Sequence, residues 1–283
     1  RKIDPRYEVD DIVETEVTPR NFGRIAAQNA KQVVVQRIRE AERGMVFEKF
    51  SSRENDIVTG IIQRMENKNV YIDLGKAEAI LTPNEQIPGE IYQYHDRMKT
   101  YIVEVKKTSK GPQIMVSRTH PGLLKRLFEL EVPEIHDGLV EIKSVAREPG
   151  MRSKISVYTK DENIDPVGAC VGHKGMRVQT IVNELRGEKI DIVKYSSEPD
   201  QYVANALSPA KVVSTEVLEE EKICRVIVPD YQLSLAIGKE GQNARLAAKL
   251  TGWKIDIKSE SQAAEEAEQG AQEVGVAYEA DED

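Results

Sequence analysis

The sequence has few of the residues on which disulfide frameworks, metal centres and membrane spans depend. Its 283 residues include two cysteines, Cys170 and Cys224, which lie in apolar segments, so a disulfide framework is not expected. The four histidines are scattered, and no Cys/His spacing suggests a metal site. No apolar run approaches the length of about 18 residues needed to span a membrane, and we expect no signal peptide. These absences favour a cytoplasmic protein without a bound metal or cofactor.

Basic and acidic residues balance, except at the carboxyl-terminal end. The formal net charge is −8, from 40 Lys and Arg residues and 48 Asp and Glu residues. Residues 259–283 contain nine of the acidic residues and no Lys or Arg, so the rest of the chain is nearly neutral. Any surface that binds a polyanion must therefore be a local basic patch. Because the chain begins at Arg1 rather than at a methionine, we expect it to be a fragment.

A unit built around a Gly-x-x-Gly turn occurs twice in the sequence. Val171–Gly175 reads Val-Gly-His-Lys-Gly, and Ile237–Gly241 reads Ile-Gly-Lys-Glu-Gly. Each turn is followed by a helical pattern and then by a Lys-Ile-Asp-Ile strand, at Lys189–Ile192 and Lys254–Ile257. A single turn of this kind arises by chance in a chain with 18 glycines. A unit repeated in one register instead indicates a duplicated domain.

The residues before the repeats divide into a helical part and a β-rich part. Ile12–Val17 has the β-branched character of a short strand, and apolar residues recur at helical spacing from residue 22 to residue 48. Residues 54–118 contain five short segments with strand character, which is typical of an OB-type β-barrel. The segments are Ile57–Ile62, Val70–Leu74, Lys76–Leu81, Lys99–Val105 and Gln113–Ser117.

Both repeats show the order helix, strand, strand, helix, glycine loop, helix and strand. A short connection, Ser196–Asp200, separates them, so we expect the barrel and the two repeats to form one stiff rod. The predicted elements of the first repeat are Leu123–Leu130, Leu139–Val145, Lys154–Thr159, Asp165–Val171, Met176–Leu185 and Lys189–Val193. Those of the second repeat are Gln201–Leu207, Val212–Val217, Cys224–Val228, Leu233–Ile237, Asn243–Leu250 and Lys254–Lys258.

These patterns resemble known RNA-binding modules. The β-rich part resembles the OB module that is repeated in the largest ribosomal protein of the small subunit, and each repeat has the element order of a type II KH domain. The order of barrel, KH and KH, with the phrases Asp165–Gly172 and Ala236–Ala247, is similar to that of the bacterial NusA family of transcription elongation and termination factors. The resemblance covers residues 1–258.

The resemblance implies a multidomain α+β fold. Residues 1–50 would be the remainder of an amino-terminal domain that binds RNA polymerase, and they would include the long helix. The other implied parts are an OB-type barrel at residues 51–119, a first KH domain at 120–196, a second KH domain at 197–258 and an acidic disordered tail at 259–283.

The resemblance also implies the function of a non-enzymatic RNA-binding transcription factor. Such a protein binds nascent single-stranded RNA through its KH domains. It acts with RNA polymerase and other elongation or antitermination factors in pausing, termination and antitermination. We expect no cofactor, no metal, no membrane contact and a monomeric state. We also expect no catalytic residues, because the sequence has no Walker loop, no His-Glu-x-x-His and no carboxylate cluster.

Two alternatives to this function remain open. KH and OB modules also form the RNA-capturing end of exoribonucleases, although there the KH module precedes the barrel. A ribosome-associated RNA scaffold would use the same modules. Binding to RNA polymerase, or phosphate-dependent RNA decay, would distinguish these classes.

The glycine loops have the chemistry that an RNA backbone requires. Glycine lets the main chain approach a phosphate, and the helix that follows presents free N–H groups and its positive dipole end. Lys174 and Lys239 add positive charge, whereas Glu240 opposes phosphate binding. We therefore expect the first loop to contribute more electrostatic attraction and the second to contribute relatively more contact with bases.

The residues beside the loops extend the predicted RNA-binding site. Arg177 and Arg245 can reach phosphates or stack on bases, and Gln242 and Asn243 offer amide groups to base edges. The predicted RNA-binding residues are Val171, Gly172, His173, Lys174, Gly175, Arg177, Ile237, Gly238, Lys239, Glu240, Gly241, Gln242, Asn243 and Arg245, with Tyr71 and Lys68 in the barrel. Val171, Val178, Ile237 and Ala244 either line the base-binding groove or belong to the core.

Three other surfaces have two interpretations each. The barrel has only Tyr71 where the module it resembles shows several aromatics, so it either binds RNA weakly or serves as a rigid spacer. The basic residues of the helix at 22–48 form either a solvated face or a surface turned to polymerase or RNA. The acidic tail is either simply disordered or mimics RNA and covers a KH groove.

Overall fold

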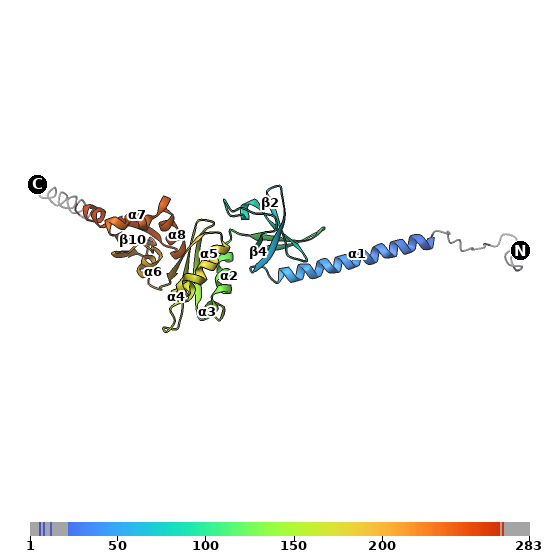
Figure 1. Ribbon diagram of the computed structural model, residues 1–283, viewed down its shortest axis with the longest axis horizontal. Coiled ribbons are helices and arrows are strands. Elements are labelled where there is room, and N and C mark those ends of the chain that lie inside the picture. Colours follow the sequence, from blue (N-terminus) through green and yellow to red (C-terminus); the bar gives the residue numbers. More distant parts are fainter. Residues whose placement is uncertain (1–5, 7, 9–11, 13–21, 267, 269–283) are drawn as a thin grey trace.

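The computed structural model describes residues 6, 8, 12, 22–266 and 268. A long helix, a β-barrel and two α/β units follow one another along its longest axis (Figure 1). All but the first residue of the expected strand at Ile12–Val17, and most of the expected acidic tail, residues 267 and 269–283, lie outside the described residues. No helix in the part of the chain that the structure describes has the length and hydropathy to cross a bilayer.

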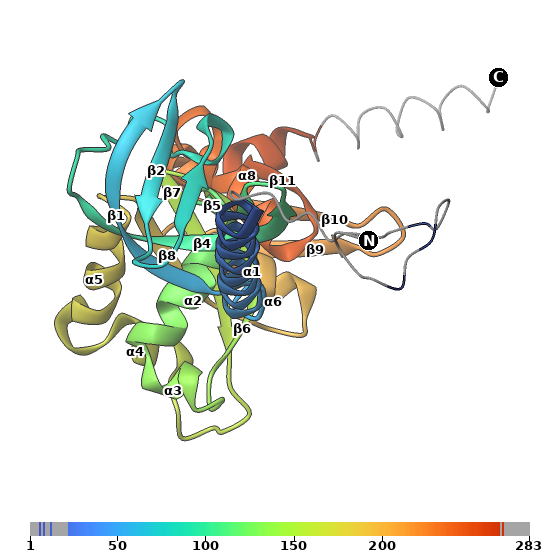
Figure 2. The same ribbon diagram turned by 90° about the vertical axis from the view of Figure 1, so that its right-hand side faces the viewer.

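The first element is α1 (Phe22–Ser51), which the helical spacing predicted to end three residues earlier. Its carboxyl-terminal end packs on the barrel, where Phe50 is buried and Val46 and Phe47 are partly buried. The preceding turns project away from the barrel, and Figure 2 shows the helix nearly end-on in front of the remaining domains. Side chains along this part, such as Val33 and Ile38, are more than half exposed.

The barrel is closed in the order β1-β2-β3-β5-β4. Its strands are β1 (Ile57–Glu66), β2 (Asn69–Asp73), β3 (Glu78–Leu81), β4 (Arg97–Thr108) and β5 (Gly111–Ser117). A short 3₁₀ turn, η1 (Pro83–Glu85), follows β3. All five predicted strands are present, with ends that differ by several residues.

The first α/β unit contains a three-stranded sheet in the order β6-β7-β8, covered on one face by helices. In chain order its elements are α2 (Pro121–Glu131), α3 (Pro133–His136), β6 (Glu141–Glu148), β7 (Arg152–Tyr158), α4 (Pro166–Val171), η2 (His173–Gly175), α5 (Met176–Glu184) and β8 (Lys189–Lys194). The four-residue helix α3 was not predicted, because it is too short to show a helical period.

The second unit repeats this arrangement with a sheet in the order β11-β10-β9. Its elements are α6 (Pro199–Ala206), β9 (Ser214–Leu218), β10 (Ile223–Val228), η3 (Asp230–Gln232), α7 (Leu233–Ile237), η4 (Lys239–Gly241), α8 (Gln242–Thr251) and β11 (Lys254–Ser259). In both units the last strand pairs parallel to the middle strand. The predicted multidomain α+β fold, with an OB-type barrel and two KH units, is therefore confirmed.

The prediction of disorder from residue 259 onward is wrong for the first residues of that segment. Ser259 ends β11, and residues 260–266 are helical. Ser259 and Gln262 cap this helix reciprocally, because the Gln262 N–H donates to Ser259 Oγ (3.3 Å) and the Ser259 N–H donates to Gln262 Oε1 (3.1 Å). The prediction of disorder was made from composition alone, which does not take this capping pair into account.

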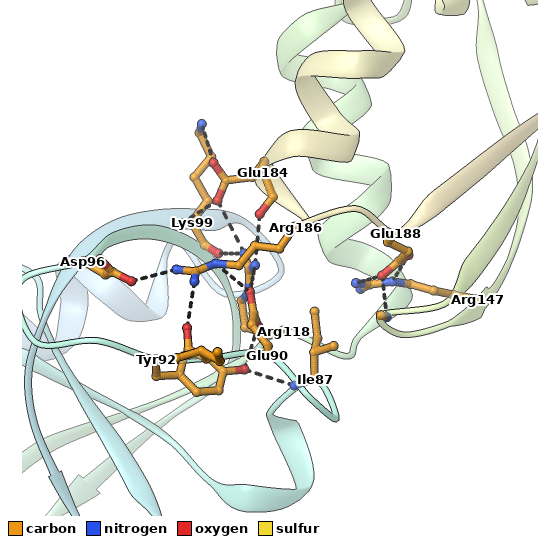
Figure 3. Close-up of polar contacts among 12 residues, drawn as sticks. Ile87, Glu90, Tyr92, Asp96, Lys99, Arg118, Arg147, Glu184, Arg186 and Glu188 are labelled. Carbon is orange, nitrogen blue, oxygen red and sulfur yellow. Dashed lines mark hydrogen bonds and ion pairs between the residues drawn. The ribbon is translucent and has the colours of Figure 1, made fainter.

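A buried ionic cluster joins the barrel to the first KH unit (Figure 3). The Arg118 side chain is fully buried, and its guanidinium is ion-paired with Glu90 of the barrel. It also donates to the backbone carbonyls of Lys99 (2.8 Å) and Glu184 (3.0 Å). Nearby, Arg186 of the KH unit donates to Asp96 of the barrel at 2.9 Å. Breaking such a pair would leave a buried charge without a partner, so these contacts stabilise the packing of the barrel against the first KH unit.

The two KH units are joined by a shared core as well as by buried polar contacts. Ala146 and Val193 of the first unit belong to the apolar cluster of the second. The fully buried Lys154 ammonium donates to Asp191 (2.9 Å) and to the backbone carbonyl of Ser208 in the second unit (2.7 Å). The positions of the two glycine loops relative to one another are therefore determined by packed residues and not by the connecting segment alone.

Candidate nucleic-acid interface

The two glycine loops have almost the same backbone conformation. In the first loop, φ is 74° at Gly172, 51° at Lys174 and 76° at Gly175. In the second loop, φ is 78° at Gly238, 54° at Glu240 and 73° at Gly241. Each loop leads directly into the amino-terminal end of a helix, α5 or α8. The repeated sequence pattern thus produces the same arrangement of backbone N–H groups twice.

The two glycines of each loop are required for different reasons. At Gly172 and Gly238, ψ is 175° and 171°, a combination with positive φ that is essentially restricted to glycine. A Cβ on Gly238 would also lie 2.8 Å from the backbone nitrogen of Asn243. At Gly175 and Gly241, nothing lies within 4 Å of an added Cβ. The first glycine of each pair therefore permits packing against the following helix, and the second leaves the loop surface open.

Charged side chains on the loops are accessible. His173 and Lys174 of the first loop are exposed, and so are Lys239 and Glu240 of the second. Neither lysine forms an ion pair with another described residue. Free ammonium groups beside the amino-terminal end of a helix attract anions such as phosphates. Because Glu240 lies in the second loop only, the first loop is the more positive of the two.

The side chain two residues after each loop supports the loop from inside. Arg177 Nη1 donates to the carbonyl of Ala169 (2.6 Å) and to Glu134 (2.8 Å). Asn243 is 3% exposed, and its Nδ2 donates to the carbonyls of Ala236 and Leu207, both at 3.0 Å. The contacts with Ala169 and Ala236 tie the helix before each loop to the helix after it.

This support changes the expected role of two predicted RNA-binding residues. The expectation that Asn243 offers its amide to a base edge does not agree with its burial, because both amide hydrogens are already donated within the domain. Its Oδ1 has no hydrogen-bond partner among the described residues. Arg177 is about one-third exposed but already engaged by Glu134, so it acts mainly on the shape of the loop.

The predicted contacts Gln242 and Arg245 are held by the other KH unit. Gln242 Nε2 donates to Glu148 Oε2 (2.8 Å), and Arg245 Nε donates to Glu148 Oε1 (2.6 Å). Arg245 Nη1 also donates to the carbonyl of Glu240 in the loop (3.1 Å). The hydrogen bond with Arg245 lowers the pKa of Glu148 and raises that of Arg245. Sequence reasoning missed Glu148, because no local pattern connects the end of β6 to a loop about ninety residues later in the chain.

The apolar residues beside the loops differ in exposure. Val178 packs against the core of the first unit, which favours the core interpretation for this residue. Ile237, directly before the second loop, is 37% exposed, and its neighbour Leu235 is 47% exposed. Val171 and Ala244 are of intermediate exposure. The apolar residues before the second loop are therefore more exposed than Val171 before the first, whereas Met176, directly after the first loop, is 67% exposed.

The two predicted barrel residues lie apart from both loops. The Arg64 guanidinium lies over the Tyr71 ring, 4.1 Å from its centroid, and pairs with Glu78 at 2.8 Å. One face of the tyrosine ring is thus already covered. Lys68 is exposed in the turn between β1 and β2. The structure brings fourteen of the sixteen predicted residues into two loop regions and leaves these two on the barrel.

Sites for other chemistry are not found in the described part of the chain. No group of three or more His, Cys, Asp or Glu side chains among residues 22–266 is arranged to hold a metal ion. Both cysteines are buried, and burial raises the pKa of the Cys170 thiol to about 12. Such a thiol is protonated at neutral pH and is a poor nucleophile.

Comparison with known proteins agrees with this arrangement along almost the whole chain. Four family models match in succession: the NusA N-terminal domain at residues 1–44, the S1 RNA binding domain at 51–117, the NusA-like first KH domain at 118–195 and the NusA-like second KH domain at 199–265. The transcription termination/antitermination protein NusA of Halalkalibacterium halodurans is 72% identical over 263 residues, which cover 93% of this chain and 69% of the relative. The chain belongs to the NusA family.

Other NusA proteins give the same result at lower identity. The Bacillus subtilis protein is 70% identical over 263 residues, covering 93% of this chain and 71% of the relative. The Thermus thermophilus protein is 47% identical over 253 residues, covering 89% of this chain and 65% of the relative. The predicted resemblance to NusA is therefore confirmed. The chain is a non-enzymatic transcription termination/antitermination factor with RNA-binding S1 and KH domains.

Proposed function

We propose that the chain binds nascent single-stranded RNA through its two glycine loops while it acts with RNA polymerase in pausing, termination and antitermination. The observation that carries this proposal is the repeated loop conformation, in which an exposed lysine lies at the amino-terminal end of a helix in both KH units. A loop of this kind clamps about four nucleotides by their backbone.

The fixed junction between the KH units supports binding of one continuous RNA strand. Because Lys154 and the shared core hold the units together, RNA bound at one loop increases the effective concentration of the same strand at the other. Two sites of about four nucleotides each give a minimum length of about eight nucleotides. RNA shorter than this should bind much more weakly, because it can occupy only one loop at a time.

The RNA-contacting residues fall into two groups in this proposal. Direct contacts come from the loops and from the apolar residues before them: Val171, Gly172, His173, Lys174 and Gly175 in the first unit, with Ile237, Gly238, Lys239, Glu240 and Gly241 in the second. Arg177 and Asn243 support the loops. Tyr71 and Lys68 provide a separate and weaker RNA contact on the barrel.

Contact with polymerase is assigned to the amino-terminal part of the chain. Residues 1–44 match the NusA N-terminal domain, and α1 exposes both apolar and basic side chains along its projecting turns. We propose a domain division at residues 1–50, 51–119, 120–196 and 197–258, with a carboxyl-terminal extension from 259. We further propose that the chain acts as a monomer, with polymerase and other elongation factors, in the cytoplasm.

Fluorescence anisotropy with a short single-stranded RNA tests the assignment of the loops. We would compare the wild type with a variant that carries Asp at His173, Lys174, Lys239 and Glu240. Reversal of charge at both loops should weaken binding by at least about tenfold at low salt, because phosphate attraction is replaced by repulsion. The matched control carries Asp at Lys160 and Lys222, which are exposed and lie outside the loops.

The outcome separates the loops from the barrel. Weaker binding of the loop variant only, with unchanged circular dichroism, assigns the RNA to the loops. Unchanged binding would place the RNA on the barrel or on α1 and would overturn the proposal. A copurification with RNA polymerase, with and without residues 1–50, tests the proposed polymerase contact separately.

A further inference from the structure

The helix that follows the second glycine loop, α8, packs on the first KH unit, and one carboxylate there accepts hydrogen bonds from two of its side chains. Glu148, the last residue of β6, accepts hydrogen bonds from Gln242 (2.8 Å) and Arg245 (2.6 Å). Arg245 in turn donates to the carbonyl of Glu240 at 3.1 Å. Glu148, Arg245 and the loop therefore form a continuous chain of polar contacts across the domain boundary.

Glu148 is not needed to hold the two units together. Their relative position is determined by the buried Lys154, which bonds the Ser208 carbonyl, and by the apolar residues Ala146 and Val193, which enter the core of the second unit. The Glu148 side chain is 18% exposed and that of Arg245 is 48% exposed. The pair thus lies at the rim of the interface, where its main effect is on the charge beside the loop.

The geometry also restricts how Arg245 can meet a phosphate. A guanidinium holds a phosphate best with two adjacent N–H groups. In Arg245, Nε is engaged by Glu148 and Nη1 by the Glu240 carbonyl, so each pair of adjacent nitrogens contains one that is already bonded. The carboxylate of Glu148 also cancels the positive charge of Arg245, and Glu240 opposes Lys239 in the same loop.

We propose that Glu148 is a specificity-determining residue of the second RNA site, which reduces the attraction of that loop for phosphate by retaining Arg245. The inference rests on the proposed binding of RNA at the loops. Retention of Arg245 makes the second site a composite of both KH units. The first loop then provides most of the backbone affinity, and binding at the second depends on base contacts beside Ile237 and Leu235.

Replacement of Glu148 by Gln removes the charge but keeps an oxygen that can accept from Arg245. RNA affinity should rise about threefold to tenfold at low salt, because one more cation becomes available to the backbone. The plot of log affinity against log salt should steepen by about 0.7, which corresponds to one additional phosphate contact on single-stranded RNA. Glu216→Gln is the matched control, because Glu216 pairs with the exposed Arg225 on the sheet of the same unit.

A double variant, Glu148→Gln with Arg245→Gln, tests whether the pair acts as a neutral unit. The proposal predicts that this variant binds RNA within about twofold of the wild type and with the same salt dependence, since it replaces one neutral pair with another. A loss as large as that of Lys239→Gln would mean that Arg245 already contacts RNA in the wild type, and it would overturn the proposal. This result does not depend on the folding of the single variant.

Failure of this inference differs from failure of the proposed function. If the wild type binds RNA through its loops but Glu148→Gln changes neither affinity nor salt dependence, the role of Glu148 is wrong and the loop assignment stands. If the wild type does not bind single-stranded RNA through its loops, both the proposed function and the role of Glu148 are wrong. Equal gains for Glu148→Gln and Glu216→Gln would show a general effect of net charge and would contradict a specific role for Glu148.

Discussion

The two glycine loops have one backbone conformation but different surroundings. Their φ angles agree within a few degrees, whereas the middle residue that adopts positive φ is Lys174 in the first loop and Glu240 in the second. The first loop is supported from inside by a partly exposed ion pair, and the second by a buried amide. The spacing of the glycines thus determines the backbone, and the residues around them determine charge and stability.

The same divergence is seen on the sheets. Alignment of the two Lys-Ile-Asp-Ile strands places Lys154 and Arg225 at equivalent positions, because they pair with Asp191 and Asp256 in the same register. Lys154 is fully buried against the second KH unit, whereas Arg225 is exposed. Equivalent positions of the two repeats therefore carry different side chains at the place where one repeat contacts a neighbouring domain and the other does not.

The largest difference in stability between the two units is expected when the side chains that support the loops are replaced. Asn243→Leu should destabilise the second unit by about 2–4 kcal/mol, because two buried carbonyls lose their donor. Arg177→Met should cost about 1 kcal/mol or less, since its ion pair with Glu134 is partly exposed. Chemical denaturation followed by Trp253 fluorescence and by circular dichroism would measure both. Similar costs for the two changes would contradict the comparison.

Replacing the first glycine of each loop by alanine should give a smaller difference in stability between the two units. Gly238→Ala places a Cβ 2.8 Å from the backbone nitrogen of Asn243, which cannot move away without moving α8. In Gly172→Ala the nearest atoms to the added Cβ are Cγ (2.6 Å), Cδ (2.8 Å) and Cβ (3.0 Å) of Arg177, of which Cγ and Cδ can rotate away. Both changes introduce backbone strain of about 1–3 kcal/mol, and Gly238→Ala should cost about 1 kcal/mol more. Thermal unfolding of the two variants provides the measurement, and a larger loss for Gly172→Ala would be the opposite result.

Acid should weaken the first unit through a group that the second lacks. Glu188 is fully buried between Arg147 and Ser153, and the position equivalent to it in the second repeat is Trp253. Burial raises the pKa of Glu188, but its hydrogen bonds and the positive charge of Arg147 lower the pKa by a larger amount. The pKa of Glu188 is therefore lower in the folded state than in the unfolded state. Its contribution to stability is therefore present above its unfolded pKa and is lost as the pH falls through the folded value.

Glu188→Gln provides the test of this pH dependence. The variant should be less stable than the wild type at pH 7, and the difference should narrow only below about pH 4, as the pH falls from the ordinary carboxylate pKa toward the lower folded pKa of Glu188. Glu141→Gln, an exposed change in the same unit, should show little difference at either pH. A Glu188→Gln deficit that stays constant as the pH is lowered from 7 to well below about 4 would show that loss of packing, and not of charge, is responsible.

Most of the fold was predictable, because the repeated pattern and the strand alternation are local signals. The elements that were missed, α3 and the helix at 260–266, are too short to show a period, and the second of them begins at the capping pair Ser259 and Gln262. The site was predictable in position but not in the role of each residue. Asn243 looks functional in a sequence because it follows a glycine loop, yet burial makes it a support. Glu148 could not be found, because the contact that matters joins two domains.

The most direct test of the unequal loops is the salt dependence of RNA binding by Lys174→Gln and Lys239→Gln, measured side by side with one single-stranded RNA. Lys174→Gln should lower affinity by about threefold to tenfold and should flatten the salt dependence by about 0.7, because one phosphate contact is lost. Lys239→Gln should lower affinity by about threefold or less, because Glu240 already opposes this charge. Equal losses and equal slopes for the two variants would contradict the account.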